Sequence, residues 1–132
     1  MKVVIDTNVL VSAMLNPRGV PAEIMSLVLS GSIKLLYDNR ILQEYVAVLN
    51  REEFGFEKGT VQNFIDFVKN ESEFVVSGRS NTKFTDEDDR KFYEVYTSGN
   101  AKYLVTGNMR HYPAEKTIVS PKKFLESTLG GH

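Results

Sequence analysis

MKVVID, the stretch from Met1 to Asp6, decides the fold of this chain. Residues 3–5 (VVI) form an unbroken β-branched run, which predicts a buried strand. The run ends abruptly at Asp6, in the polar triplet DTN. A buried strand that ends in polar groups is typical of an α/β sheet that carries its functional site at the carboxyl ends of its strands.

Beyond this stretch, short apolar runs alternate with segments whose apolar residues recur at helical spacing. Further strands are predicted over residues 34–37, 74–76, 103–106 and 118–119. Helices are predicted to begin at Pro21, after a cap at Asp38 or Asn39, at Thr60, at Asp86 after a cap at Thr85, and at Ser120. The alternation predicts a single α/β domain, with a central parallel sheet flanked by helices on both faces. We expect the domain to cover residues 1–128, with a flexible tail over residues 129–132.

The composition limits the classes to which the protein can belong. The 132 residues are 42% hydrophobic and 25% charged, which is ordinary for one globular domain. There is no cysteine, which excludes a disulfide framework and a thiolate zinc site. No apolar run approaches the ~20 residues that span a bilayer, and the start lacks the pattern of a signal peptide. We therefore expect a cytoplasmic protein without a membrane segment.

Charge is segregated along the chain. The net charge is −1, so any contact with nucleic acid must use a local basic patch rather than bulk positive charge. Residues 102–123 supply such a patch, with five cations against the single acid Glu115, whereas residues 86–89 are four consecutive acids.

Two polar segments are expected to meet at one edge of the sheet. The first strand is followed by Asp6-Thr7-Asn8, and the strand YLVT is followed by Gly107-Asn108. If both strands are central and parallel, their carboxyl ends lie side by side.

Glu44 interrupts the apolar pattern of its helix. It lies three residues after Ile41 and four before Val48, which places its carboxylate on the apolar face. The alternative is an acid at the border of that face, reaching into solvent.

Asp89 is the sharpest anomaly in the sequence. Residues 86–88 are explained as acids in the first turn of a helix, where the helix dipole favours negative charge. Asp89 would instead be the fourth helical residue, where a hydrophobic residue would pack on Phe84. An acid beside the aromatic residues of this helix is unfavourable unless it is paired or binds a cation.

Asp6, Glu44 and Asp89 together indicate a cation site, although Asp6 alone could be only a helix cap. Clustered carboxylates repel one another unless they are neutralised. Hard divalent cations prefer oxygen ligands, so the cluster favours Mg²⁺ or Mn²⁺ and phosphoester chemistry.

Several blocks of the sequence resemble, in order and over nearly the whole length, the PIN domain, the nuclease fold of VapC-type toxins. The blocks are VVIDTNVLVSAM (3–14), RILQEYVAVL (40–49), TDEDDRKFYEV (85–95), AKYLVTGN (101–108) and IVSPKKFLE (118–126). The resemblance is to the branch described as toxin components of toxin–antitoxin systems.

The resemblance implies catalytic and metal-binding roles for Asp6, Glu44 and Asp89. Asp88 competes with Asp89, because a shift of one residue in an acid pair is hard to exclude. The family pattern has a fourth acid where this chain has Asn108, whose side-chain oxygen is a further candidate ligand. This departure leaves open both full activity and a second metal ion.

Other residues are expected to shape the site or to contact substrate. Thr7, Asn8 and Thr106 are candidates for hydrogen bonds within the site, or else only satisfy their turns. Arg110, His111 and Lys116 are candidates for RNA binding, with Tyr112 as a stacking residue, although this basic segment could equally be a solvated surface.

The resemblance implies a Mg²⁺- or Mn²⁺-dependent endoribonuclease that acts as a toxin, with a cognate antitoxin protein and a homodimeric assembly. Two alternatives stay open: a PIN-like module that binds RNA or protein with little catalysis, and a phosphatase or other phosphate-handling α/β enzyme.

Overall fold

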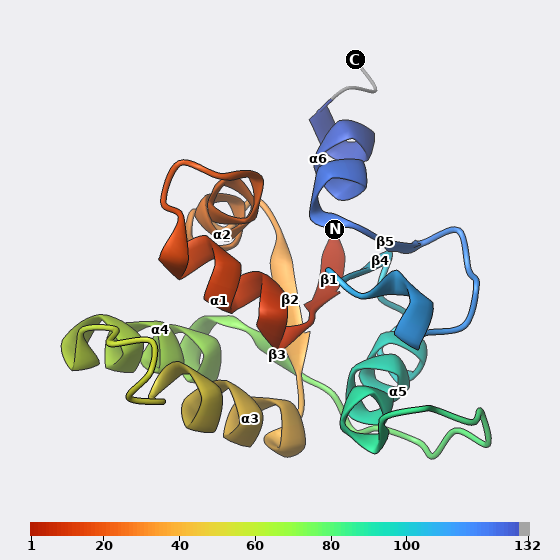
Figure 1. Ribbon diagram of the computed structural model, residues 1–132. Coiled ribbons are helices and arrows are strands. Elements are labelled where there is room, and N and C mark those ends of the chain that lie inside the picture. Colours follow the sequence, from red (N-terminus) through yellow and green to blue (C-terminus); the bar gives the residue numbers. More distant parts are fainter. Residues whose placement is uncertain (130–132) are drawn as a thin grey trace.

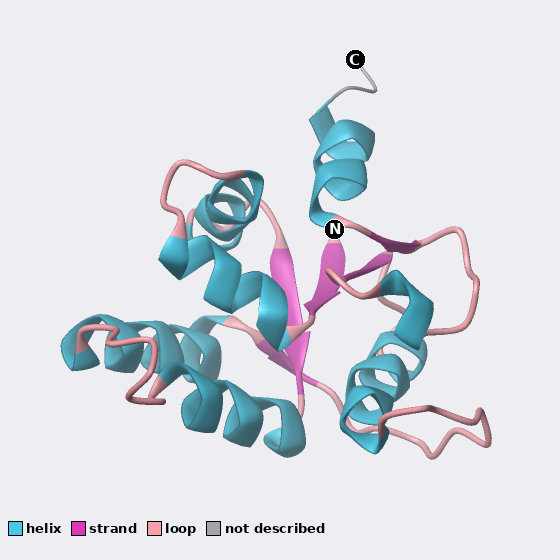
Figure 2. Cartoon of the chain, in the orientation of Figure 1, coloured by secondary structure: helices cyan, strands magenta, loops and turns pink. Residues whose placement is uncertain are grey.

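The computed structural model describes residues 1–129, which form a parallel five-stranded sheet with helices on both faces (Figures 1 and 2). The strands are β1 (Lys2–Ile5), β2 (Lys34–Tyr37), β3 (Glu73–Phe74), β4 (Tyr103–Val105) and β5 (Ile118–Val119). The helices are α1 (Thr7–Leu15), α2 (Val20–Leu29), α3 (Asn39–Leu49), α4 (Lys58–Glu71), α5 (Arg90–Ser98) and α6 (Pro121–Leu129). The predicted α/β class is confirmed. Most of the expected tail, residues 130–132, lies outside the described part of the chain.

The sheet has the strand order β3-β2-β1-β4-β5, and every adjacent pair is parallel. The chain starts in the middle of the sheet, builds outward through β2 and β3, and then crosses to β4 on the other side of β1. The topological switch point therefore lies between β1 and β4, whose carboxyl ends form the natural position for a site. In Figure 1, α1 to α4 lie to the left of the central strands and α5 to the right.

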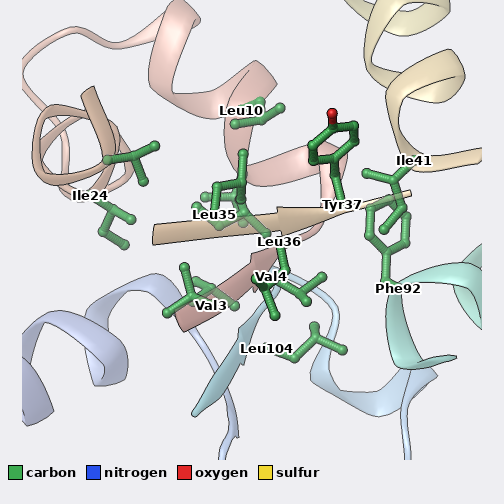
Figure 3. Close-up of a cluster of buried hydrophobic side chains, with 14 of the residues drawn as sticks. Val3, Val4, Leu10, Ile24, Leu35, Leu36, Tyr37, Ile41, Phe92 and Leu104 are labelled. Carbon is green, nitrogen blue, oxygen red and sulfur yellow. The ribbon is translucent and has the colours of Figure 1, made fainter. Parts of the chain in front are cut away.

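The core explains why these strands read as continuous apolar runs. Residues 3–5 of β1 are completely buried, because the central strand is covered on both faces. Figure 3 shows side chains of β1, β2 and β4 together with Leu10 and Ile24 from the helices and Phe92 from α5. No helix among residues 1–129 combines the length and the apolar composition that a membrane crossing requires.

Several boundaries differ from the sequence prediction. Helix α4 begins at Lys58 rather than Thr60, because the carboxylate of Glu57 caps it by accepting from the Thr60 amide at 3.1 Å. Strand β3 is shorter than predicted and ends at Phe74. Helix α1 was not predicted; it follows Asp6 directly, and the side chain of Asp6 makes no capping hydrogen bond within that helix.

The acid run also folds differently from the prediction. Asp86, not Thr85, is the cap: its Oδ1 accepts from the Asp88 amide at 2.9 Å. A 3-10 turn, Glu87–Asp89, follows, and α5 begins only at Arg90. Asp89 is therefore the last residue of a tight turn rather than the fourth residue of a regular helix. The turn directs Asp89 differently from its exposed neighbours in the acid run.

Candidate active site

The pairing of β1 with β4 brings the first two site residues together. Ile5 is in register with Val105, and the backbone amide of Asp6 donates to the Val105 carbonyl at 2.9 Å. The next residue on each strand is thus Asp6 beside Thr106, 100 positions away in the sequence. The Thr106 hydroxyl donates to Oδ2 of Asp6 at 2.8 Å. The expected meeting of the two strand ends is confirmed.

Asp6 is buried, with only 5% of its surface exposed, and it receives a second donor from Tyr112. The Tyr112 hydroxyl donates to the same Oδ2 at 3.0 Å. Burial raises the pKa of Asp6, the hydrogen bonds from Thr106 and Tyr112 lower it, and the negative charge of Glu44 raises it again. The net pKa lies above the ordinary value, so Asp6 is a carboxylate whose ionised form needs more positive charge than the described residues supply.

Glu44 lies on α3 and faces the same edge, but both of its oxygens are engaged. Oε2 accepts from the Thr7 hydroxyl in a short contact, and Oε1 lies 2.6 Å from the ammonium of Lys91. The side chain of Glu44 is 22% exposed, so it lies between the core and solvent, which fits either the apolar face or its border. Its charge raises the pKa of Asp6, which places it within electrostatic reach of the site.

Asp89 is the carboxylate with the least satisfied environment. Its side chain is 14% exposed, and Oδ2 is buried without a hydrogen-bond partner among the described residues. Nδ1 of His111 lies 3.3 Å from this oxygen and forms an ion pair with it when the imidazole is protonated. Burial, followed by the negative charges of Asp6 and Asp86, raises the pKa of Asp89 to about 6, and the charge and hydrogen bond of His111 oppose this rise. While His111 is neutral, a buried carboxylate beside a second buried carboxylate is unfavourable without a further cation.

The two remaining candidate ligands differ from Asp6 and Asp89 in their exposure to solvent. Asp88 is exposed, and its carbonyl accepts from Lys91 at 2.6 Å. Asn108 is also exposed, and its backbone amide donates to the Thr106 hydroxyl at 3.0 Å. Of the neighbouring acids, Asp89 is therefore the one that faces the site.

The residues expected to shape the site each make a contact there. Thr7 donates to Glu44, and Thr106 links Asp6 to the backbone of Asn108. The side-chain oxygen of Asn8 accepts from the Gly107 amide at 3.1 Å, which ties the start of α1 to the turn after β4.

The candidate RNA-binding residues are all exposed, but they lie at different ends of the strands. Arg110 and His111 belong to the 3-10 turn Met109–His111, which follows β4, whereas Lys116 precedes the start of β5 and so lies toward the amino ends of the strands, away from Asp6. Tyr112 does not fit its expected role as a stacking residue: it is only 7% exposed, because its ring is buried and its hydroxyl is committed to Asp6. A base could stack on Tyr112 only if this side chain left the core.

Lys91 was missed by the sequence prediction, and Tyr112 was predicted in a different role, as a stacking residue. Tyr112 lies in a basic loop, where an aromatic residue indicates substrate contact as readily as burial. Lys91 lies in a helix-start segment rich in charges, and its partner Glu44 is on another helix. No pattern within either segment signals these contacts.

A second charged cluster lies outside the site and holds the neighbouring elements together. Arg40 contacts Oδ2 of Asp38 at 2.7 Å and Oε1 of Glu94 at 2.8 Å, and both carboxylates are buried. The other oxygen of Glu94 accepts from the Ser80 amide at 2.7 Å. This cluster joins α3, α5 and the loop before α5. Its carboxylates are paired with a permanent cation, whereas Asp6 accepts from hydroxyls and Asp89 faces His111, which is charged only when protonated.

The donor set fits a hard divalent cation that takes few protein ligands. Among the described residues, no group of three or more His, Asp and Glu side chains is placed to hold a metal ion together. Mg²⁺ commonly uses one or two carboxylates and completes its shell with water and substrate phosphate. The unpaired Oδ2 of Asp89 and the carboxylate of Asp6 supply ligands of this kind.

Comparison with known proteins identifies the family of the chain. An uncharacterized protein of Methanocaldococcus jannaschii is 32% identical to the chain over 111 residues, which cover 82% of this chain and 71% of that protein. The family model described as PIN domain matches residues 2–110. This range contains strands β1 to β4 and every candidate ligand named above. The chain therefore belongs to the PIN domain family, whose members are generally metal-dependent nucleases.

Proposed function

We propose that this protein is a Mg²⁺- or Mn²⁺-dependent endoribonuclease, with its reactive centre at Asp6 and Asp89. The observation that carries the proposal is the buried Oδ2 of Asp89, which lacks a hydrogen-bond partner among the described residues. The negative charge of Asp6 also raises the pKa of Asp89. Two such carboxylates suit a divalent cation that also binds a phosphate. Such an ion, when bound, polarises the phosphate and lowers the pKa of a water molecule.

The chain's own residues prepare this centre. Thr106 and Tyr112 donate to one oxygen of Asp6, which favours its ionised form and fixes the orientation of the carboxylate. Neither donor reaches Oδ1, and the backbone amide of Asn8 gives the ionised carboxylate further support. The bond from Gly107 to Asn8 fixes the turn after β4 beside these groups.

Substrate binding is assigned to the exposed cations beside the centre. Arg110 and His111 directly precede Tyr112, whose hydroxyl donates to Asp6, so an RNA strand bound there would bring its phosphates close to Asp6 and Asp89. Lys116, before the start of β5, would extend the contact toward the amino ends of the strands. The net charge of −1 favours this local contact over general attraction to nucleic acid.

In the cell, we propose that the protein is the toxin of a type II toxin–antitoxin pair, acts in the cytoplasm as a homodimer and is restrained by a cognate antitoxin. Support comes from membership of the PIN domain family and from the resemblance of the ordered sequence blocks to VapC-type toxins. A neighbouring gene for a small protein with a DNA-binding domain would be expected.

The direct test is cleavage of end-labelled RNA by the purified protein with Mg²⁺, with Mn²⁺ and with a chelator. We expect internal cuts that need the metal and that disappear in Asp6→Asn and in Asp89→Asn. Asp88→Asn is the matched control, because Asp88 is the exposed neighbour of Asp89 and should keep its activity. Full activity of both Asp6→Asn and Asp89→Asn would refute the proposal.

A second candidate, an RNA- or protein-binding module with little catalysis, is favoured by Asn108. This residue follows β4 where the family pattern has an acid, and the described part of the site thus has one carboxylate fewer. For such a module, Mn²⁺ would bind weakly, and RNA would stay intact even with Asn108→Asp.

A further inference from the structure

Glu44 differs from the other two carboxylates in how its charge is balanced. One oxygen lies 2.6 Å from the ammonium of Lys91, and the other accepts from the Thr7 hydroxyl. By contrast, Oδ2 of Asp89 has no hydrogen-bond partner among the described residues. The site therefore has one carboxylate neutralised by a lysine and two without a permanent cation: Asp6 accepts from two hydroxyls, and Asp89 faces His111, which is charged only when protonated.

Lys91 is held firmly in this position. Its side chain is only 12% exposed, and its ammonium also donates to the Asp88 carbonyl at 2.6 Å. The ammonium lies 5.3 Å from the centre of the Phe92 ring, which adds a favourable cation–π contact. Lys91 thus joins α3, through Glu44, to the 3-10 turn that carries Asp89. A flexible surface lysine would not be fixed by two oxygens on different elements.

We propose that Lys91 is the resident cation on the Glu44 side of the site, so that the site takes a single divalent ion, at Asp6 and Asp89. Glu44 is then a positioning residue, which holds Thr7 and Lys91, rather than a metal ligand. This inference rests on the proposed function, because it concerns the metal of that same site.

The formal charges agree with one ion. Asp6, Glu44 and Asp89 contribute three negative charges when ionised, and Lys91 returns one positive charge. The remaining charge of minus two is balanced by one Mg²⁺ or Mn²⁺. A second divalent ion would need either the loss of Lys91 or a further acid, and Asn108 supplies no charge.

The experiment is a Mn²⁺ titration of the purified protein without RNA, followed by calorimetry and by the electron paramagnetic resonance signal of free Mn²⁺. We expect one Mn²⁺ per wild-type chain and two per chain in Lys91→Met, which keeps the length of the side chain but frees Glu44. Lys91→Arg should keep one ion. Lys34→Gln is the matched control, because Lys34 also donates to a backbone carbonyl, that of Glu71, at the opposite ends of the strands.

Glu44→Gln tests the same inference without touching Lys91. It should still bind one Mn²⁺, with an affinity less than about tenfold weaker, whereas Asp89→Asn should weaken binding by about a hundredfold. Loss of Mn²⁺ binding in Glu44→Gln to the extent seen in Asp89→Asn would overturn the inference. Two Mn²⁺ ions per wild-type chain, or only one per chain of folded Lys91→Met, would also overturn the inference.

The result is separable from the proposed function. If the wild type binds one Mn²⁺ with the expected dependence on Lys91 but leaves RNA intact, the nuclease assignment fails and the assignment of Lys91 stands. If RNA is cleaved but Glu44→Gln removes the ion, the assignment of Lys91 fails and the nuclease assignment stands. If the wild type binds no Mn²⁺, both fail.

Discussion

The hydroxyl of Tyr112 donates a hydrogen bond to Oδ2 of Asp6 over 3.0 Å, although the two residues are 106 positions apart. Thr106 donates to the same oxygen from the neighbouring strand end. Both donors lower the pKa of Asp6, against the burial that raises it. The loop after β4 therefore helps to control the ionisation of the acid that ends β1.

Tyr112→Phe removes one of these donors and keeps the ring. We expect the pKa of Asp6 to rise further, because a hydrogen bond to the ionised form is lost. The acidic limb of the pH profile of kcat/KM should then move to higher pH. Because the hydrogen bond to buried Asp6 is lost, the free energy of unfolding should also fall by about 1 kcal/mol.

Tyr103→Phe is the control for this change, because Tyr103 packs edge-on against Phe124 and its hydroxyl has no hydrogen-bond partner among the described residues. Its pH profile should match the wild type. An unchanged profile in Tyr112→Phe would show that the bond to Asp6 does not control its ionisation.

Asp89 should make the metal-free protein less stable as pH rises. Its pKa is raised from 3.8 to about 6, so between these values the folded state binds more protons than the unfolded state, and stability falls with increasing pH. Below 3.8 the carboxyl is protonated in both states, and above about 6 no further loss occurs. Asp89→Asn should therefore gain about 1 kcal/mol over the wild type at neutral pH, after allowance for solvent screening.

Urea unfolding over this pH range, in the presence of a chelator, measures the difference between the two proteins. The difference should be small near pH 4, grow up to about pH 6 and then stay constant. A difference that does not depend on pH would mean that Asp89 does not carry an unfavourable charge. Asp88→Asn, at the exposed neighbour, should show no such rise.

Arg40→Met should destabilise the fold through Asp38 and Glu94. Both carboxylates are buried and share Arg40 as their cation. Its removal leaves two buried negative charges without a positive partner. Because Arg40 itself is 46% exposed, water offsets part of the loss, and we expect about 2 kcal/mol. Thermal unfolding measures this effect. Arg79→Met, at an exposed arginine on the same loop surface, should change stability little, and an equal loss in both variants would contradict the pairing.

Arg110→Gln and Lys116→Gln should weaken RNA binding in a salt-dependent way. Each phosphate contact that is lost reduces the slope of log affinity against log salt by about 0.7 for a single strand. Fluorescence anisotropy in an Asp6→Asn background would measure binding without cleavage. Lys34→Gln should leave the slope unchanged, because Lys34 starts β2, on the other side of β1 from β4 and β5. A wild-type slope in both Arg110→Gln and Lys116→Gln would place the RNA elsewhere.

The fold was predictable because its signals are local and strong. Residues 3–5 are an apolar run that only a buried strand explains, and the triplet DTN at the end of this run marked the edge that β1 shares with β4. The start of α5 was not predictable in detail. Asp86 and Thr85 are both good caps, and the choice of Asp86 depends on a 3-10 turn that tertiary contacts select.

The candidate site was predictable only in its acids. Glu44 and Asp89 stood out because each opposes the apolar pattern around it. Lys91 and Tyr112 could not be found in this way, because a lysine near a helix start and a tyrosine in a loop fit their local surroundings. Their partners, Glu44 and Asp6, lie on distant segments that only the folded chain brings near.

The most direct test of the metal centre is anomalous diffraction from crystals of the wild-type protein soaked in Mn²⁺. We expect one strong anomalous peak within coordination distance of the carboxylates of Asp6 and Asp89, and none in crystals of Asp89→Asn. A peak at another place in the molecule, or the same peak in Asp89→Asn, would contradict the assignment of these two carboxylates as the centre of the nuclease.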